Sequence, residues 1–170
     1  RCGPSGRTTT PPSGLGQAHL EHWLAHHHFD RRFLVHFDPS ETYVHLTAGG
    51  SAEMLPGGEQ FWSMPEPEID RYGHGWLLSE FECSTDWSSW EMHPEAEEFV
   101  YLLSGAATLL LELPSGLSSV PLNGRAAVLV PRGVWHTAKV SKPSRMLFVT
   151  RGHGTQHRPA AEDAAPPPSA

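Results

Sequence analysis

Thirteen residues near the middle of the chain, from His93 to Gly105, carry the side chains best suited to chemistry. Their sequence is HPEAEEFVYLLSG, with a histidine at one end and Glu98 directly before an apolar run. A second stretch, PRGVWH, ends at His136 after a Pro-x-Gly turn. Imidazole nitrogens and carboxylate oxygens are common ligands of first-row divalent metals. If these residues lie on the strands of one β-barrel, they predict a site for a single metal ion.

The alternation of side chains along a strand decides which of these residues can meet. Successive residues point to opposite faces, so Glu91 and His93 share one face. Residues 86–93 and 97–104 are expected to pair, and Glu98 could then meet His93 across the hairpin. Two roles remain open for Glu91, either a fourth metal ligand or a base beside the metal.

From Glu41 onward the sequence pattern is typical of an all-β domain. Short apolar stretches recur between turn signals such as Pro114-Ser-Gly116, which is typical of a β-sandwich or barrel. Trp76 and Trp87 are expected in the core, and His153 and His157 after the last strand. The expected strands are 43–46, 76–83, 86–93, 97–104, 107–113, 120–122, 126–130, 134–140 and 145–150, with a short helix near 59–62.

The two ends of the chain differ in composition from its middle. Residues 1–18 are rich in Gly, Pro, Ser and Thr, and residues 19–36 hold half of the 12 histidines. Residues 159–170 are rich in Ala and Pro. We expect disorder over 1–40 and 159–170, around one barrel domain at 41–158. The histidine-rich tract is either a metal-binding element or, as we expect, an extension that binds metal only adventitiously.

Charge and cysteine content argue against several classes of protein. The formal net charge is −7 and the pI is about 5.9, so no basic surface for nucleic acid is expected. The sequence shows no apolar run of membrane-spanning length and no secretory signal. Cys2 and Cys83 do not have the spacing of a disulfide framework, and we expect Cys83 to be a small buried thiol. A reducing, cytoplasmic location is the resulting expectation.

The stretches 93–105 and 131–136 resemble the paired motifs of the cupin superfamily, and of its small single-domain bacterial members in particular. The first cupin motif is G-x5-H-x-H-x3,4-E-x6-G, and its second His, its Glu and its last Gly match His93, Glu98 and Gly105. The second motif is G-x5-P-x-G-x2-H-x3-N. Its Pro, Gly and His match Pro131, Gly133 and His136.

The chain also departs from the cupin pattern. Glu91 stands where the first His is expected, and Trp87 stands where the first motif begins with Gly. In the second motif, Gly124 lies one residue too far from the Pro, and Val140 replaces the Asn. The resemblance extends from about Tyr43 to Pro159. These departures put the composition of the metal site in doubt more than the fold.

The resemblance implies an all-β fold, a single double-stranded β-helix or jelly-roll barrel. It implies a metal site of Glu91, His93, Glu98 and His136, with Fe, Mn or Zn expected and Ni or Cu as alternatives, because carboxylates favour harder ions. Glu91 and Glu98 are also the candidate catalytic residues, since a carboxylate that is not tightly ligated can shuttle a proton. A homodimer is implied as well, and it would cover exposed strand edges.

Two functions of different classes remain. The first is a metal-dependent enzyme, dioxygenase- or isomerase-like, in which the ion acts as a Lewis acid or binds a small organic substrate and dioxygen. The second is a non-catalytic cupin that binds or senses a small molecule. The second is favoured by the lack of an obvious further catalytic group beside the ligands.

Overall fold

The computed structural model describes residues 35–160. The expected disorder of the chain ends falls mostly outside this range, as does the histidine-rich tract apart from His36. Within the expected N-terminal extension, Asp38 accepts hydrogen bonds from the backbone N–H (2.9 Å) and the hydroxyl (2.7 Å) of Ser40. This turn leads into the first strand.

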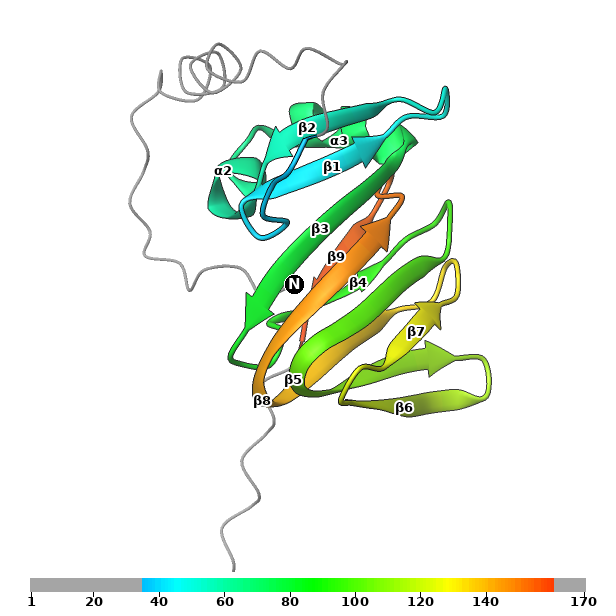
Figure 1. The fold of residues 1–170 in the computed structure, drawn as a ribbon. Coiled ribbons are helices and arrows are strands. Elements are labelled where there is room, and N and C mark those ends of the chain that lie inside the picture. Colours follow the sequence, from blue (N-terminus) through cyan, green and yellow to red (C-terminus); the bar gives the residue numbers. More distant parts are fainter. Residues whose placement is uncertain (1–34, 161–170) are drawn as a thin grey trace, which may run out of the picture.

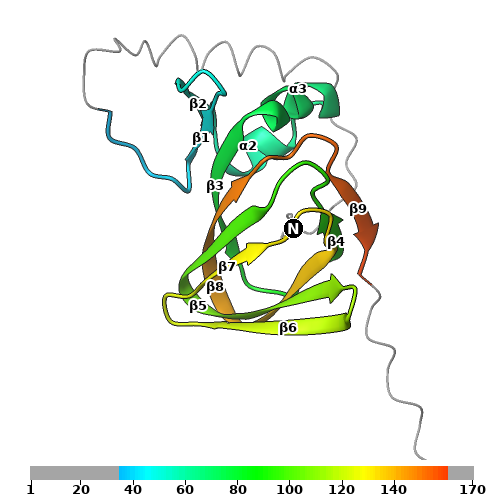
Figure 2. The ribbon, with the colours of Figure 1, turned by 90° about the vertical axis from the view of Figure 1, so that its right-hand side faces the viewer.

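Within residues 35–160, nine strands form one antiparallel sheet that rolls up into a barrel, as Figure 2 shows in a view down its axis. The path of hydrogen-bonded neighbours is β2-β1-β3-β8-β4-β9, and β5 pairs with β6, β7 and β8. The expected all-β, jelly-roll barrel is therefore confirmed. The strands are β1 Thr42–Leu46, β2 Ala52–Pro56, β3 Trp76–Cys83, β4 Ser89–Met92, β5 Glu98–Leu113, β6 Gly116–Asn123, β7 Ala127–Val130, β8 His136–Thr150 and β9 Gln156–Pro159.

The long strands β5 and β8 pair along most of their length and form the spine of the barrel (Figure 1). The sequence predicted each of them as two shorter strands, and that was wrong. The predicted breaks coincide with an irregular stretch, where the register shifts between Leu102 and Ala107. Gly105 lies there with φ of +89°, and Pro143 lies opposite on β8. A bulge tolerates a residue without a backbone N–H, so the strands continue through it.

The same bulge changes which alternate residues of β5 are buried. Before it, the buried side chains are Glu98, Val100 and Leu102; after it, they are those of Ala107, Leu109 and Leu111. Because side chains alternate with a period of two, one extra residue moves the apolar set to the other parity. The bulge thus keeps both halves of β5 facing the core, with Glu98 inside.

The expected hairpin of 86–93 with 97–104 is not formed. β4 pairs with β8, where Glu91 lies opposite His136, and with β9. β9 was missed because its four residues, QHRP, show no apolar alternation. It is held to β4 partly by the Arg158 guanidinium, which lies 5.3 Å from the Trp90 ring centroid. His157 therefore lies on a strand rather than after the last one.

A small cap stands at one end of the barrel. It consists of the β1–β2 hairpin, α2 Gly58–Trp62, α3 Glu66–Asp70 and the 3-10 helix η1 Arg71–His74 (Figure 1). The helix near 59–62 is confirmed as α2, whereas β2, α3 and η1 were not predicted. The cap has its own buried cluster, distinct from the barrel core, formed by Tyr43, Leu55, Phe61, Tyr72 and Leu77.

Two expectations about single side chains are wrong. Trp87 is buried in the barrel core as predicted, but Trp76 is 39% exposed, because it starts β3 on the outward-facing parity. Cys83 is buried as expected, yet it is disulfide-bonded rather than a free thiol. The cytoplasmic location, which relied on reduced cysteines, stays a prediction. Within residues 35–160, no helix has the length and apolar character needed to cross a membrane.

Candidate metal centre

The four predicted site residues come together inside the barrel from three strands. Glu91 lies on β4 and His93 directly after it, Glu98 is the first residue of β5, and His136 is the first of β8. Their exposed fractions are 0, 3, 1 and 0%. Such residues are rarely buried without partners, because an unpaired polar group in the interior costs free energy.

Carboxylate and imidazole side chains alternate around a common centre. Nε2 of His136 lies 3.1 Å from Oε2 of Glu98 and 3.4 Å from Oε1 of Glu91. Nε2 of His93 lies 3.4 Å from Oε1 of Glu98 and 3.9 Å from Oε1 of Glu91. One ligand atom from each of the four residues lies within 4.8 Å of all the others. Glu91 is thus placed as a full member of the cluster.

Hydrogen bonds on the far side of each imidazole fix its orientation. Thr155 gives its only hydroxyl proton to the Gly152 carbonyl oxygen, at 2.7 Å, so its oxygen must accept from Nδ1–H of His93, at 2.8 Å. In the same way, Nδ1 of His136 faces the carbonyl oxygen of Val134 at 3.2 Å, and a carbonyl only accepts. Both rings therefore direct Nε2 to the centre, the usual arrangement of metal-binding histidines.

Glu98 is held by neighbours that favour its charged form. The Thr150 hydroxyl donates to Oε1, and Nε2 of His136 lies at hydrogen-bond distance from Oε2. Burial alone would raise the pKa of Glu98, but attraction to His93 and the hydrogen bond with His136 outweigh it and lower the pKa well below its usual range. Glu98 is therefore ionised at neutral pH.

The cluster is built to hold positive charge. Burial alone would lower the pKa of His136, but hydrogen bonds to Glu91 and Glu98 outweigh burial and raise the pKa to about 10. The same two carboxylates could balance a divalent cation in place of protons on the imidazoles. Nε2 of His93 is buried and makes no hydrogen bond among residues 35–160, which leaves its lone pair available. The donor set thus fits a first-row divalent ion.

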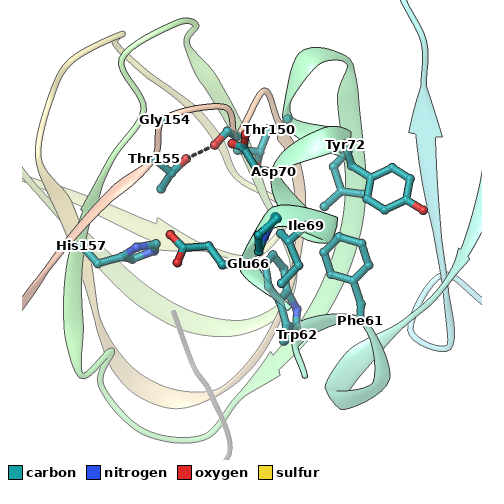
Figure 3. A pocket seen from close by; sticks show the side chains of 14 residues that line it. Phe61, Trp62, Glu66, Ile69, Asp70, Tyr72, Thr150, Gly154, Thr155 and His157 are labelled. Carbon is teal, nitrogen blue, oxygen red and sulfur yellow. Dashed lines mark hydrogen bonds between the residues drawn. The ribbon is translucent and has the colours of Figure 1, made fainter. Parts of the chain in front are cut away.

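A cavity of about 460 Å³ lies between the cap and the barrel, next to this cluster. Figure 3 shows an apolar side formed by aromatic and aliphatic side chains of the cap, and a polar side where His157 and Glu66 point toward one another. The four clustered residues do not line the cavity. Thr150 and Thr155 do line it, and they are the residues that hold Glu98 and His93.

Three residues of this site were not singled out as parts of the metal centre from the sequence. Thr150 and Thr155 carry no motif signal, since their role depends on the register of β8 and the turn that follows it. From the sequence, His157 was expected only to follow the last strand. It lies opposite Glu91 across β4 and β9, with Nε2 at 3.5 Å from Oε2 of Glu91, and is 54% exposed. It connects the buried cluster with the cavity.

Several other side chains with polar or charged groups lie away from the centre. Tyr101 faces outward, where its hydroxyl accepts a hydrogen bond of 2.8 Å from Arg125. Lys139 forms an ion pair of 3.1 Å with Asp86, and Arg132 is exposed. None of these side chains contacts the cluster in the described structure.

Comparison with known proteins gives likenesses of fold. No family model matches the chain, and no curated protein does. A hydroquinone 1,2-dioxygenase from Sphingomonas matches 43% of this chain and 57% of its own at 18% identity and a TM-score of 0.38. A cupin superfamily protein from Desulfitobacterium hafniense matches 44% and 65% at 19% identity and a TM-score of 0.39.

A cupin-2 domain protein from Shewanella frigidimarina matches 44% of this chain and 68% of its own at 15% identity, with a TM-score of 0.36. Cupins are thus among the solved structures that this chain is similar to. The chain spans only about half of the dioxygenase, 57% of its length. At this level of similarity, the substrates and activities of these proteins are not assigned to this chain.

Proposed function

We propose that this protein is a metal-binding protein of the cupin type that acts on, or binds, a small organic molecule. The observation that carries the proposal is the buried cluster of Glu91, His93, Glu98 and His136, in which both histidines turn Nε2 inward. Glu91 takes the place of a histidine and makes the set two carboxylates and two imidazoles. That set favours Fe, Mn or Zn, with Ni or Cu as alternatives.

The four residues would hold the ion, and the ion would supply Lewis acidity or a place for substrate and dioxygen. The cavity would receive the body of the organic molecule against Phe61, Trp62 and Ile69. Apolar walls with a few polar groups at one end are typical of small-molecule sites. His157 is placed between Glu91 and the cavity, where it could pass a proton from one to the other.

An enzyme is the first proposal, and a binding or sensor protein is the second. The enzyme is supported by the cavity beside the cluster and by His157, which lies between Glu91 and that cavity. The sensor is supported by the burial of all four ligands, since the cavity reaches Thr150 and Thr155 rather than the ligands themselves. A molecule in the cavity would then act on the metal through these hydroxyls and His157 rather than by direct contact.

The first experiment is elemental analysis of the full chain in which the histidines of the tract 19–28 are replaced by glutamine. This background removes adventitious binding by the tract. We expect about one tightly held transition-metal ion per chain, lost in both His93→Ala and His136→Ala while the circular dichroism of the barrel persists. His45→Gln, which changes a buried histidine outside the cluster, is the matched control. Alanine variants that retain as much metal as their parent would refute the centre.

A second experiment separates enzyme from sensor. Dioxygen consumption by the iron-loaded chain is measured with a panel of diketones, phenols and thiols. Turnover that disappears in His136→Ala would establish an enzyme. Binding of a panel member without turnover, detected by a thermal shift, would support the sensor.

A further inference from the structure

A second group of metal-binding side chains lies outside the buried cluster. Asp70 ends α3, His74 ends η1, and His153 lies in the connection between β8 and β9. One ligand atom from each of the three lies within 4.8 Å of the others. Nδ1 of His153 lies 3.0 Å from Oδ1 of Asp70, and the rings of His74 and His153 are 4.1 Å apart between centroids.

The backbone brings these three residues together before any ligand arrives. Asp70 and His74 are four residues apart where α3 continues into the 3-10 helix η1, and both side chains reach His153. Gly73 packs directly against His153, whose backbone N–H donates to the Gly73 carbonyl oxygen at 3.3 Å. A Cβ on Gly73 would lie 2.6 Å from Cα of His153, so only glycine permits this approach.

The surroundings of this group are suited to a cation. Oε1 of Glu95 lies 3.8 Å from Nε2 of His153, on the side away from Asp70. Imidazole with carboxylate suits Zn²⁺, Ni²⁺ or Cu²⁺. Ligand atoms bound to one such ion lie at most about 4.2 Å apart, twice the bond length. The exposed side chains of Asp70 and His74 need only rotate slightly to reach that spacing.

We propose that Asp70, His74 and His153 form an outer site for a divalent transition-metal ion, separate from the buried centre. The site joins the helical cap to the β8–β9 connection. Asp70, Gly73, Gly152 and Gly154 all line the cavity, so an ion here fixes one wall of it. Thr155, which orients His93, belongs to the same connection. The outer ion therefore stabilises both the cavity wall and the turn that supports the buried centre.

The test is Zn²⁺ titration, followed by calorimetry, of the full chain with the tract histidines 19–28 replaced by glutamine. We expect two equivalents per chain. His153→Ala and His74→Ala should each weaken the second equivalent by at least ~10-fold and leave the first unchanged. In His136→Ala, one equivalent should remain, and adding His153→Ala should remove it. His45→Gln is the control for loss of a histidine elsewhere.

A second readout reports on the wall of the cavity. With the buried centre filled, further Zn²⁺ should slow amide hydrogen exchange in residues 66–74 and 151–155, and this protection should vanish in His153→Ala. The proposal is overturned if no second equivalent binds, or if it binds equally well to both variants. If instead the buried cluster binds no metal, His136→Ala would bind as many ions as its parent, so the two results can be told apart.

Discussion

The single hydroxyl proton of Thr155 determines which ring nitrogen of His93 faces the buried cluster. Thr155 donates to the Gly152 carbonyl and accepts from His93, so the histidine must carry its proton on Nδ1. An alanine at position 155 would remove that acceptor. The ring could then rotate or take the other tautomer, in which Nε2 carries a proton and cannot bind a metal.

We predict that Thr155→Ala weakens metal binding by ~10–100-fold, the usual effect of losing a residue that orients a ligand. Thr155→Ser, which keeps the hydroxyl, should retain most of the affinity. Competition with a fluorescent chelator measures both. Thr137→Ala is the matched control, because that hydroxyl also donates to a backbone carbonyl oxygen, that of Ser89 at 2.9 Å, but makes no hydrogen bond to His93. Equal affinity of Thr155→Ala and wild type would contradict the role.

The residues of the buried cluster were predictable from the sequence, and the residues that orient them were not. His93, Glu98 and His136 have motif spacing, and Glu91 shares the face of His93 by simple alternation. Thr155 meets His93 only because the β8–β9 turn returns to the end of β4, a contact 62 residues apart in sequence. Such contacts depend on tertiary structure, and the local spacing of residues in the sequence does not predict them.

At the scale of elements, the bulge in β5 shows how one glycine serves the site. Gly105 takes a φ of +89°, and a Cβ there would lie 2.2 Å from the Pro143 carbonyl oxygen. The bulge keeps Glu98 and the apolar residues beyond it on the buried face. Gly124 has a φ of +66°, but a Cβ at that position would have nothing within 4 Å. A comparison of alanine substitutions at the two glycines therefore distinguishes the cost of a left-handed backbone from the cost of a steric clash.

We predict that Gly124→Ala lowers the free energy of unfolding by ~1–2 kcal/mol, the cost of a left-handed backbone for alanine. Gly105→Ala should cost a further ~1–3 kcal/mol, because the strands must move apart. Urea unfolding followed by tryptophan fluorescence measures both changes. If the two variants are equally stable, the close approach of β5 and β8 does not contribute.

Phe61 anchors the cap that forms the apolar wall of the cavity. It is fully buried, and its ring centroid lies 5.5 Å from that of Tyr43 and 5.9 Å from that of Tyr72. We predict that Phe61→Ala destabilises the cap by ~3–5 kcal/mol, as expected for a large cavity in a core. Hydrogen exchange should then accelerate in residues 42–74 while β5 and β8 stay protected. Phe61→Leu should show a smaller effect, and uniform acceleration across the chain would contradict a separate cap.

The predictability of an element followed the strength of its local pattern. β3 and β7 were found nearly to the residue because their apolar runs end at clear turn residues. β9 and η1 were missed because short polar segments owe their conformation to the strands and loops beside them. The β4–β5 hairpin was predicted from closeness in sequence, yet both strands instead pair with β8, whose length offers two sites for pairing.

For the whole molecule, the strand edges bear on assembly. Among the described residues, β6 and β7 pair only with β5, and each carries a strongly exposed leucine, Leu117 at 63% and Leu129 at 60%. An edge strand with exposed apolar side chains is a ready place for another chain to pair. We therefore keep the prediction of a homodimer and place its contact at β6 and β7.

Sedimentation velocity of the full chain should give a mass twice 18.7 kDa at micromolar concentration. Leu117→Lys combined with Leu129→Lys should shift the protein toward the monomer, because the charges would lose solvation at the interface. Leu46→Lys, an exposed leucine on β1 that is 38% accessible, is the matched control and should leave the dimer intact. A monomer at every concentration would refute dimerisation. A dimer that survives the double change but not the control would move the contact to the cap, beside the cavity and the proposed outer metal site.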